Sequence, residues 1–319
     1  MNTKRIGGVA AALAIAGVFS LMTSPADAAT PSDSTLIPRT ALFGNPVKAQ
    51  ARLSPDGKSI SFLAPKDGVL NVWLAPFGQL GSAKPITADK KRGIREHLWA
   101  HDNRHILFLQ DEDGNENWRV YSVDTQTGKQ TDITPYKDVQ AQIVGVSHKR
   151  PGVALIALND RVPEWHDLYE IDIATGTRKL VEKNDHEFGG YVADQDLKPR
   201  IAQKPLATGG EIYRRGDKGW EKLLDYGQED SLTTAPLAIE GDGRTALLMS
   251  ASGRDKAALV RADLSSGKLT VIGESEVMVV ERRVLVSLKY SISPKQSPAR
   301  RMFSSRPVLL TFASPPLMM

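Results

Sequence analysis

A turn signature that returns at a nearly constant interval constrains the fold of this chain more than any other feature. A polar turn opens an apolar strand at Asp56, Asp102 and Asp242, and weaker copies stand at Gly152 and Lys198. In chain order, these five markers are separated by 46, 50, 46 and 44 residues. Repetition at intervals of about 20 to 50 residues is typical of repeat architectures, so the body of the chain is expected to consist of similar units.

A second landmark recurs half an interval later, where a strand ends in a turn that carries glycine. Its glycines step by 48, 43 and 48 residues: Gly128, Gly176, Gly219 and Gly267. Glycine permits the positive φ of tight hairpins, and the flanking runs alternate apolar and polar residues as strands do. Four short strands per interval describe a propeller blade. The predicted fold is all-β: five recognisable four-stranded blades of a six- or seven-bladed propeller, with a sandwich of coincidental spacing as the alternative.

The N-terminus has the pattern of a secretory signal. Lys4 and Arg5 precede an apolar run, and a small-residue site predicts cleavage after Ala28. A periplasmic or secreted location follows, with no membrane span after cleavage. The expected organisation is a signal peptide (1–28), a linker (29–47), the propeller (48–276) and an aberrant tail (277–319).

The tail breaks the repeat and the charge balance at the same point. It carries one acid and seven bases: Arg282, Arg283, Lys289, Lys295, Arg300, Arg301 and Arg306. Since the basic excess is confined to this segment, it does not indicate a nucleic-acid interface. We expect a disordered segment translated out of frame, and a genuine basic tail is the alternative. Cysteine is absent, which excludes disulfides and thiolate sites.

Three segments of the body carry a further signal: FLQDEDGNENWRVYSVD (108–124), LNDRVPEWHDLY (158–169) and DQDLKPR (194–200). They resemble the prolyl oligopeptidase family, in particular its bacterial dipeptidyl and acylaminoacyl peptidase-like branch. The resemblance implies a propeller that restricts peptide access to a C-terminal α/β-hydrolase domain, where a serine, a histidine and an aspartate cleave the peptide. This sequence contains no Gly-x-Ser-x-Gly elbow, so no catalytic residue is assigned.

The resemblance therefore predicts the truncated, non-catalytic recognition domain of a secreted serine peptidase. A stand-alone TolB-like periplasmic propeller that binds an envelope protein is the alternative. A third hypothesis is a propeller on which a separately encoded hydrolase chain docks. No cofactor is expected under any of them.

Carboxylates and amides crowd one loop between two expected strands: Asp111, Glu112, Asp113, Asn115, Glu116 and Asn117. By resemblance, this loop and Arg161 are candidate substrate-binding residues, since a carboxylate pairs well with a peptide's amino terminus. A solvated polar turn explains the same residues. A calcium loop of the EF-hand type is disfavoured, because Glu116 stands where glycine is required.

Two further patterns have structural explanations. His97, His101 and His105 recur at every fourth residue, but a turn at Asp102 interrupts them, so no metal site is expected. Five tryptophans occur about once per blade and are expected to lie in the core between blades: Trp73, Trp99, Trp118, Trp165 and Trp220.

Overall fold

The computed structural model describes residues 37–274. The chain divides into two compact units, Met1–Gly44 and Asn45–Met319. In the first unit the described residues form one short helix, α1 (Arg39–Phe43). Within residues 37–274, no helix has the length and apolar character needed to span a membrane. The expected signal peptide and basic tail lie outside the described residues.

The strands of the second unit form five four-stranded sheets in the described residues, each built from consecutive strands. The first sheet contains β1 (Ala49–Leu53), β2 (Ser59–Lys66), β3 (Val69–Pro76) and β4 (Lys84–Pro85). The second contains β5 (His97–Trp99), β6 (His105–Gln110), β7 (Arg119–Asp124) and β8 (Gln130–Asp132). The third contains β9 (Ala141–Val146), β10 (Val153–Val162), β11 (Trp165–Asp172) and β12 (Arg178–Glu182).

The last two sheets repeat the same plan. The fourth contains β13 (Gly190–Ala193), β14 (Pro199–Leu206), β15 (Gly209–Gly216) and β16 (Gly219–Gly227). The fifth contains β17 (Ala235–Ile239), β18 (Thr245–Ser250), β19 (Ala258–Asp263) and β20 (Leu269–Gly273). Two 3₁₀ turns, η1 (Leu80–Ser82) and η2 (Gln228–Asp230), lie in connections. The predicted propeller of five recognisable blades is confirmed.

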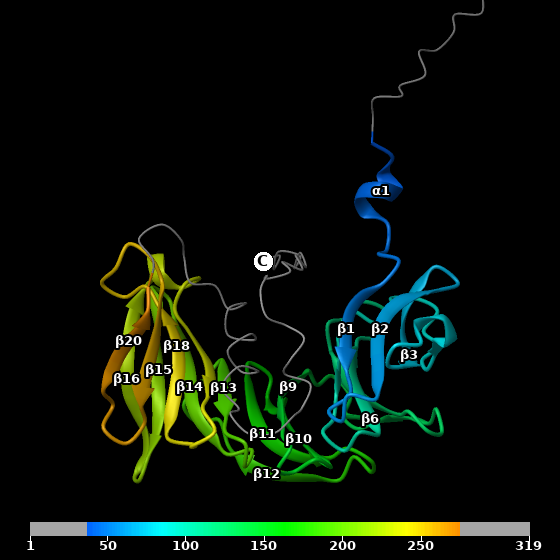
Figure 1. Ribbon diagram of the computed structural model, residues 1–319. Coiled ribbons are helices and arrows are strands. Elements are labelled where there is room, and N and C mark those ends of the chain that lie inside the picture. The colour runs from blue at the N-terminus through cyan, green and yellow to red at the C-terminus, as the bar shows by residue number, and fades with distance from the viewer. Residues whose placement is uncertain (1–36, 275–319) are drawn as a thin grey trace, which may run out of the picture. The chain divides into compact units, whose positions relative to one another are not determined.

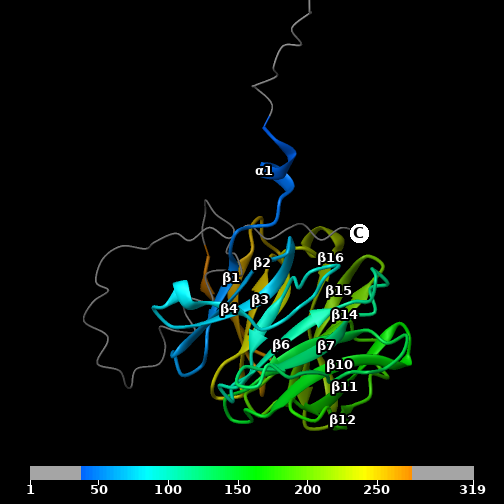
Figure 2. The same cartoon turned by 90° about the vertical axis from the view of Figure 1, so that its right-hand side faces the viewer.

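The sheets follow one another in chain order, and in the first, third and fourth sheets the first strand contacts the first strand of the next sheet. Contacts between strands join β1 to β5, β9 to β13 and β13 to β17, while β9 also meets β7. Figure 1 shows the resulting succession from β1 to β20, and Figure 2 shows β10, β11 and β12 side by side in the third sheet. Each sheet is therefore one blade, and the first strands line the inner side of the series.

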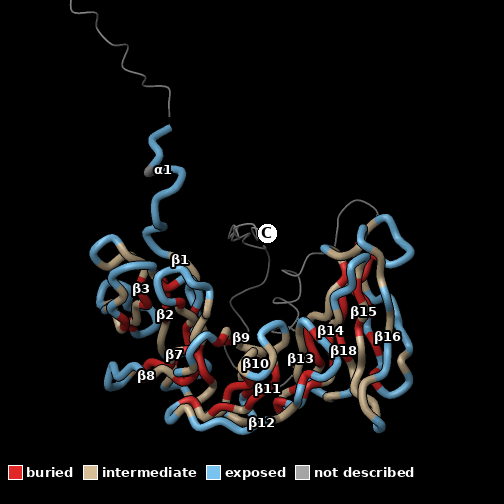
Figure 3. Tube along the Cα trace, turned by 180° about the vertical axis from the view of Figure 1, so that it is seen from behind, coloured by how far each residue is buried: buried red, intermediate tan, exposed pale blue. Residues whose placement is uncertain are grey.

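Apolar side chains fill the space between successive blades. Leu107, Ile156 and Ile171 belong to the cluster between the second and third blades, and Leu248 and Val260 to the cluster between the fourth and fifth. Figure 3 shows buried residues concentrated in the strands and exposed residues in the turns. Packing between faces supplies the stability of a chain without disulfides.

The prediction for the tryptophans was largely wrong. Only Trp99 is buried, in the cluster between the first and second blades, where its Nε1 donates to the Arg52 carbonyl oxygen 3.3 Å away. The other four are half-buried. Tryptophan is large, and its indole N–H needs a partner, so positions at the margin of a blade suit it. Trp220, for example, donates from Nε1 to Glu182 of the preceding blade at 3.0 Å.

Candidate functional site

One face of the propeller carries the longest loops, and we call it the connection face. The chain alternates direction along each sheet, so the hairpin between a blade's second and third strands lies at the same end as the connection to the next blade. The connection face thus comprises the hairpin loops 67–68, 111–118, 163–164, 207–208 and 251–257, and the connections 86–96, 133–140, 183–189 and 228–234. All seven predicted site residues lie on or beside it.

The predicted acidic loop joins β6 to β7, and its first residue is structural. The Asp111 side chain is only 1% exposed and lies 3.3 Å from Nε of Arg92, which comes from the connection between the first two blades. The second carboxylate oxygen of Asp111 accepts a bond of 3.4 Å from the Glu116 amide. Asp111 therefore closes the loop on itself and is not exposed to a ligand.

The remaining residues of the loop divide into paired and unpaired groups. Asp113 is ion-paired with Lys91 at 2.8 Å, and Asn115 Oδ1 accepts a bond of 3.0 Å from the Asn117 amide. Those contacts agree with the polar-turn interpretation. In contrast, the exposed carboxylates of Glu112 and Glu116 form no ion pair within the described part of the chain. These two are the groups of the loop that remain available to a ligand.

The loop also contacts the third blade. Nε2 of Gln140 donates to the Glu116 carbonyl oxygen at 3.1 Å, and the amide of Gln140 donates to Oδ1 of Asn159 on β10 at 2.6 Å. The Trp118 amide donates to the same carbonyl at 2.9 Å. The backbone of Glu116 is therefore held through both its N–H and its C=O, although its φ of +59° is unfavourable for a residue with a side chain.

Arg161 lies in the third blade and takes part in a separate ion-pair group. Its guanidinium donates to both oxygens of Asp167, at 2.7 and 2.8 Å, and pairs with Asp185 at 3.0 Å. Burial raises the pKa of Asp167, but the bonds from Arg161 and the Asn184 amide outweigh it, so the pKa lies below its usual range. Because Arg161 already has two carboxylate partners, it is not a free carboxylate-binding group.

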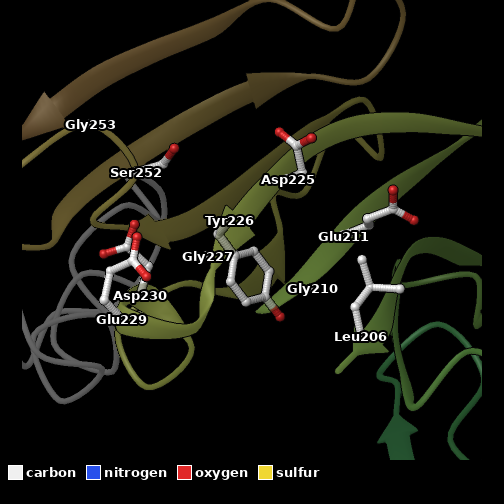
Figure 4. A pocket seen from close by; sticks show the side chains of 10 residues that line it. All are labelled: Leu206, Gly210, Glu211, Asp225, Tyr226, Gly227, Glu229, Asp230, Ser252 and Gly253. Carbon is white, nitrogen blue, oxygen red and sulfur yellow. The ribbon is translucent and has the colours of Figure 1, made fainter. Parts of the chain in front are cut away.

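Two hollows lie on the connection face, and sequence reasoning missed both. One, of about 330 Å³, is lined by Asp185, His186, Glu187, Phe188, Lys204 and Tyr213. The other, of about 430 Å³, lies between the fourth and fifth blades, with four carboxylates in its wall: Glu211, Asp225, Glu229 and Asp230. Figure 4 shows them around Tyr226. The Gln228-Glu229-Asp230 run was a visible signal, but Glu211 and Asp225 are 14 residues apart in the sequence and meet only because β15 and β16 pair.

The three spaced histidines have separate structural partners. His97 is buried, and its Nε2 lies 2.9 Å from Ser61 Oγ. His105 bonds to Asp102 at 2.5 Å, and His101 packs edge-on against His148 with ring centroids 6.2 Å apart. Among the described residues, no group of three or more side chains could hold a metal ion.

Comparison with known proteins extends these observations. No family model matches the chain. A curated relative, dipeptidyl aminopeptidase BIII of Pseudoxanthomonas mexicana, is 44% identical over 253 residues, covering 79% of this chain and 37% of the relative. The chain corresponds to the β-propeller portion of prolyl oligopeptidase-family peptidases. It spans about a third of the length of the curated relatives that it matches.

Two further comparisons give matches of lower sequence identity. Dipeptidyl peptidase family member 6 of Caenorhabditis elegans is 27% identical over 243 residues, covering 70% of this chain and 32% of the relative. The solved structure of prolyl oligopeptidase B from Galerina marginata matches with a TM-score of 0.52 and 10% identity, over 74% of this chain and 35% of that chain. At that identity the structural likeness supports the propeller fold alone.

Proposed function

We propose that the chain is the non-catalytic, substrate-recognising propeller of an exported prolyl oligopeptidase-family serine peptidase. The observation that carries the proposal is the 44% identity to a dipeptidyl aminopeptidase across most of the chain. The sequence contains no Gly-x-Ser-x-Gly elbow, which supports a non-catalytic role. The hydrolase domain that acts with it is supplied by further sequence or by a separately encoded chain, and the N-terminal signal pattern supports a periplasmic or secreted location.

Recognition takes place on the connection face, where Glu112 and Glu116 receive the amino terminus of a peptide. Of the loop's four carboxylates, these two have no ion-pair partner among the described residues, whereas Asp111 and Asp113 are neutralised by Arg92 and Lys91. A carboxylate that accepts hydrogen bonds from an ammonium group forms a charge-assisted contact, about twice as strong as a neutral one. Substrates with a free N-terminus are therefore preferred over N-blocked ones.

Two assays test the proposal on the purified chain. Chromogenic dipeptide amides are expected to remain uncleaved, and hydrolysis that co-purifies with the chain would overturn the non-catalytic assignment. Calorimetry with an unlabelled dipeptide is expected to detect binding, and N-acetylation is expected to abolish it. Glu116→Gln should weaken binding about tenfold, the equivalent of roughly 1.4 kcal/mol.

Glu164→Gln is the matched control, because Glu164 is also an exposed carboxylate in a hairpin loop of the connection face. It should leave the dipeptide affinity unchanged. Equal affinity for the free and the N-acetylated dipeptide would contradict amine recognition. A protein-binding propeller of the alternative kind would show no dependence on the dipeptide amine.

A further inference from the structure

The connection between the first two blades contains a basic segment that the resemblance did not single out. Lys90, Lys91 and Arg92 follow Asp89, whose backbone is fixed to the first blade by Asn71. Asn71 is fully buried; its Oδ1 accepts a bond of 2.7 Å from the Asp89 amide, and its Nδ2 donates to the Asp89 carbonyl oxygen at 3.0 Å. The basic segment therefore begins from a rigid point.

Arg92 extends from this point to the acidic loop of the second blade. Besides its ion pair with Asp111, the guanidinium lies against Gly114, where any side chain would place its Cβ 2.9 Å from Arg92 Nη1. Gly114 also has a φ of +88°, which glycine adopts without cost. The loop thus accommodates Arg92 through both a buried carboxylate and a missing side chain.

These contacts form a continuous path from the first blade to a candidate ligand-binding residue. Asn71 fixes Asp89, the segment places Arg92, Arg92 holds Asp111, and Asp111 accepts the Glu116 amide. A buried carboxylate that loses its partner is costly, so removing the cation at position 92 should destabilise this conformation of the loop.

We propose that Arg92 is a positioning residue, which sets the direction of the Glu116 carboxylate by holding the acidic loop through Asp111. The inference rests on the proposed function only for the identity of the ligand, which is the amino terminus of a peptide. The ordering of the loop by a side chain from the neighbouring blade stands on the contacts themselves. Arg92 does not touch the ligand, and it acts on recognition through the loop.

Hydrogen exchange on the purified chain tests the ordering. Arg92→Ala should speed exchange of the Glu116 and Trp118 amides at least about tenfold, because the loop loses the charged bond that closes it. Ile133, whose amide bonds to Val120 at 3.0 Å in the same blade, should keep its rate. Lys90→Ala is the control, since exposed Lys90 in the same segment has no recorded contact in the described residues. Arg92→Lys, which retains a cation, should restore part of the protection.

Dipeptide calorimetry then tests the consequence for recognition. Arg92→Ala should weaken binding of the free-amine dipeptide about tenfold, and combining it with Glu116→Gln should add little, because both remove the same contact. Glu116→Gln alone should leave exchange in the loop unchanged. If wild-type protein binds no dipeptide, the proposed function fails while the exchange result still decides the role of Arg92. Wild-type exchange rates in Arg92→Ala, or equal acceleration at Ile133, would overturn the positioning role.

Discussion

Asp124, Asp172 and Asp263 perform the same task in three different blades. Each ends a third strand, and in each its carbonyl accepts a bond of 2.8 Å from the glycine four residues later. The Oδ1 atom of each aspartate also accepts hydrogen bonds from the backbone amides of the residues two and three positions after that aspartate. These carboxylates satisfy amides that a tight turn leaves unpaired, which is why the aspartate and the glycine recur together.

The glycines of these turns offer a matched comparison. Gly128 and Gly176 have φ values of +73° and +75°, but a Cβ at Gly176 would lie 3.3 Å from Ile133 Cα, whereas one at Gly128 would meet nothing within 4 Å. Gly128→Ala should cost about 1 kcal/mol for the left-handed backbone alone, and Gly176→Ala about 2 kcal/mol or more. Urea unfolding measures both. Gly145→Ala is the control, being in open space without positive φ; equal costs for all three would contradict the argument.

His97 makes acid stability dependent on a buried imidazole. Burial lowers its pKa to about 3, and the positive charge of Arg52 acts in the same direction. Since the ordinary value is about 6.5, the unfolded chain takes up this proton first as the pH falls. The free energy of unfolding then declines between roughly pH 6.5 and pH 3, by up to about 1.4 kcal/mol per pH unit from this group.

His97→Gln removes this titration and keeps a partner for Ser61 Oγ. The variant should therefore lose stability less steeply than the wild type between pH 6 and pH 4, as judged by urea unfolding at several pH values. His186→Gln, at an exposed histidine, is the control and should keep the wild-type slope. Parallel pH profiles for His97→Gln and the wild type would show that His97 does not contribute.

At the scale of the element, buried threonines in three of the four connections between blades accept an amide from a neighbouring strand or hairpin. Oγ1 of Thr87, Thr134 and Thr234 accepts the amide of Val72, Val120 and Ala251, at 2.9, 2.8 and 3.2 Å respectively. All three threonines are buried. Thr87 and Thr134 supply an acceptor just after the outermost strand of the blade has ended, and Thr234 supplies one directly before β17 begins, so the amide is not left unsatisfied.

Thr134→Val tests this role with little change of shape. The Val120 amide would lose its acceptor inside the blade, which should cost about 1 to 3 kcal/mol in thermal or urea unfolding. Thr131→Val is the control, because Thr131 lies half-buried on β8 with no side-chain hydrogen bond recorded in the described residues. That change should be neutral or slightly stabilising, since valine suits strands. A Thr134→Val variant as stable as Thr131→Val would contradict the assignment.

The blades could be predicted from sequence because their signals are local. Turns such as 54–57 and 124–128 fix hairpins within a few residues, so β2, β6, β10 and β18 begin one to three residues after the turn markers of the sequence. The acidic loop was likewise placed correctly between two strands. Its contacts with Arg92 and Gln140 were not foreseeable, since these residues reach it from the connections on either side of the second blade. The tryptophan prediction failed because the spacing of about one tryptophan per repeat shows which blade each belongs to, but not how deeply its side chain is buried.

At the scale of the propeller, the boundaries between blades differ in kind. Among the described residues, the cluster between the second and third blades holds twelve buried side chains, and the one between the third and fourth only four. The latter boundary relies more on polar contacts, since Glu182 accepts bonds from Arg215 at 2.8 Å and from the Trp220 indole at 3.0 Å. Units that contact only their neighbours separate first where the shared interface is weakest.

Native-state hydrogen exchange in low urea should therefore show two groups of amides, with β13–β20 opening together at a lower free energy than β5–β12. Glu182→Ala should widen this difference, because Arg215 and Trp220 lose their shared acceptor. The control Glu164→Ala removes an exposed carboxylate of the third blade and should leave both groups unchanged. If all five blades exchange as one cooperative unit in the wild type, the boundary next to β13 is not the weakest. In that case, the number of buried apolar side chains at a boundary between two blades would not determine how stable that boundary is.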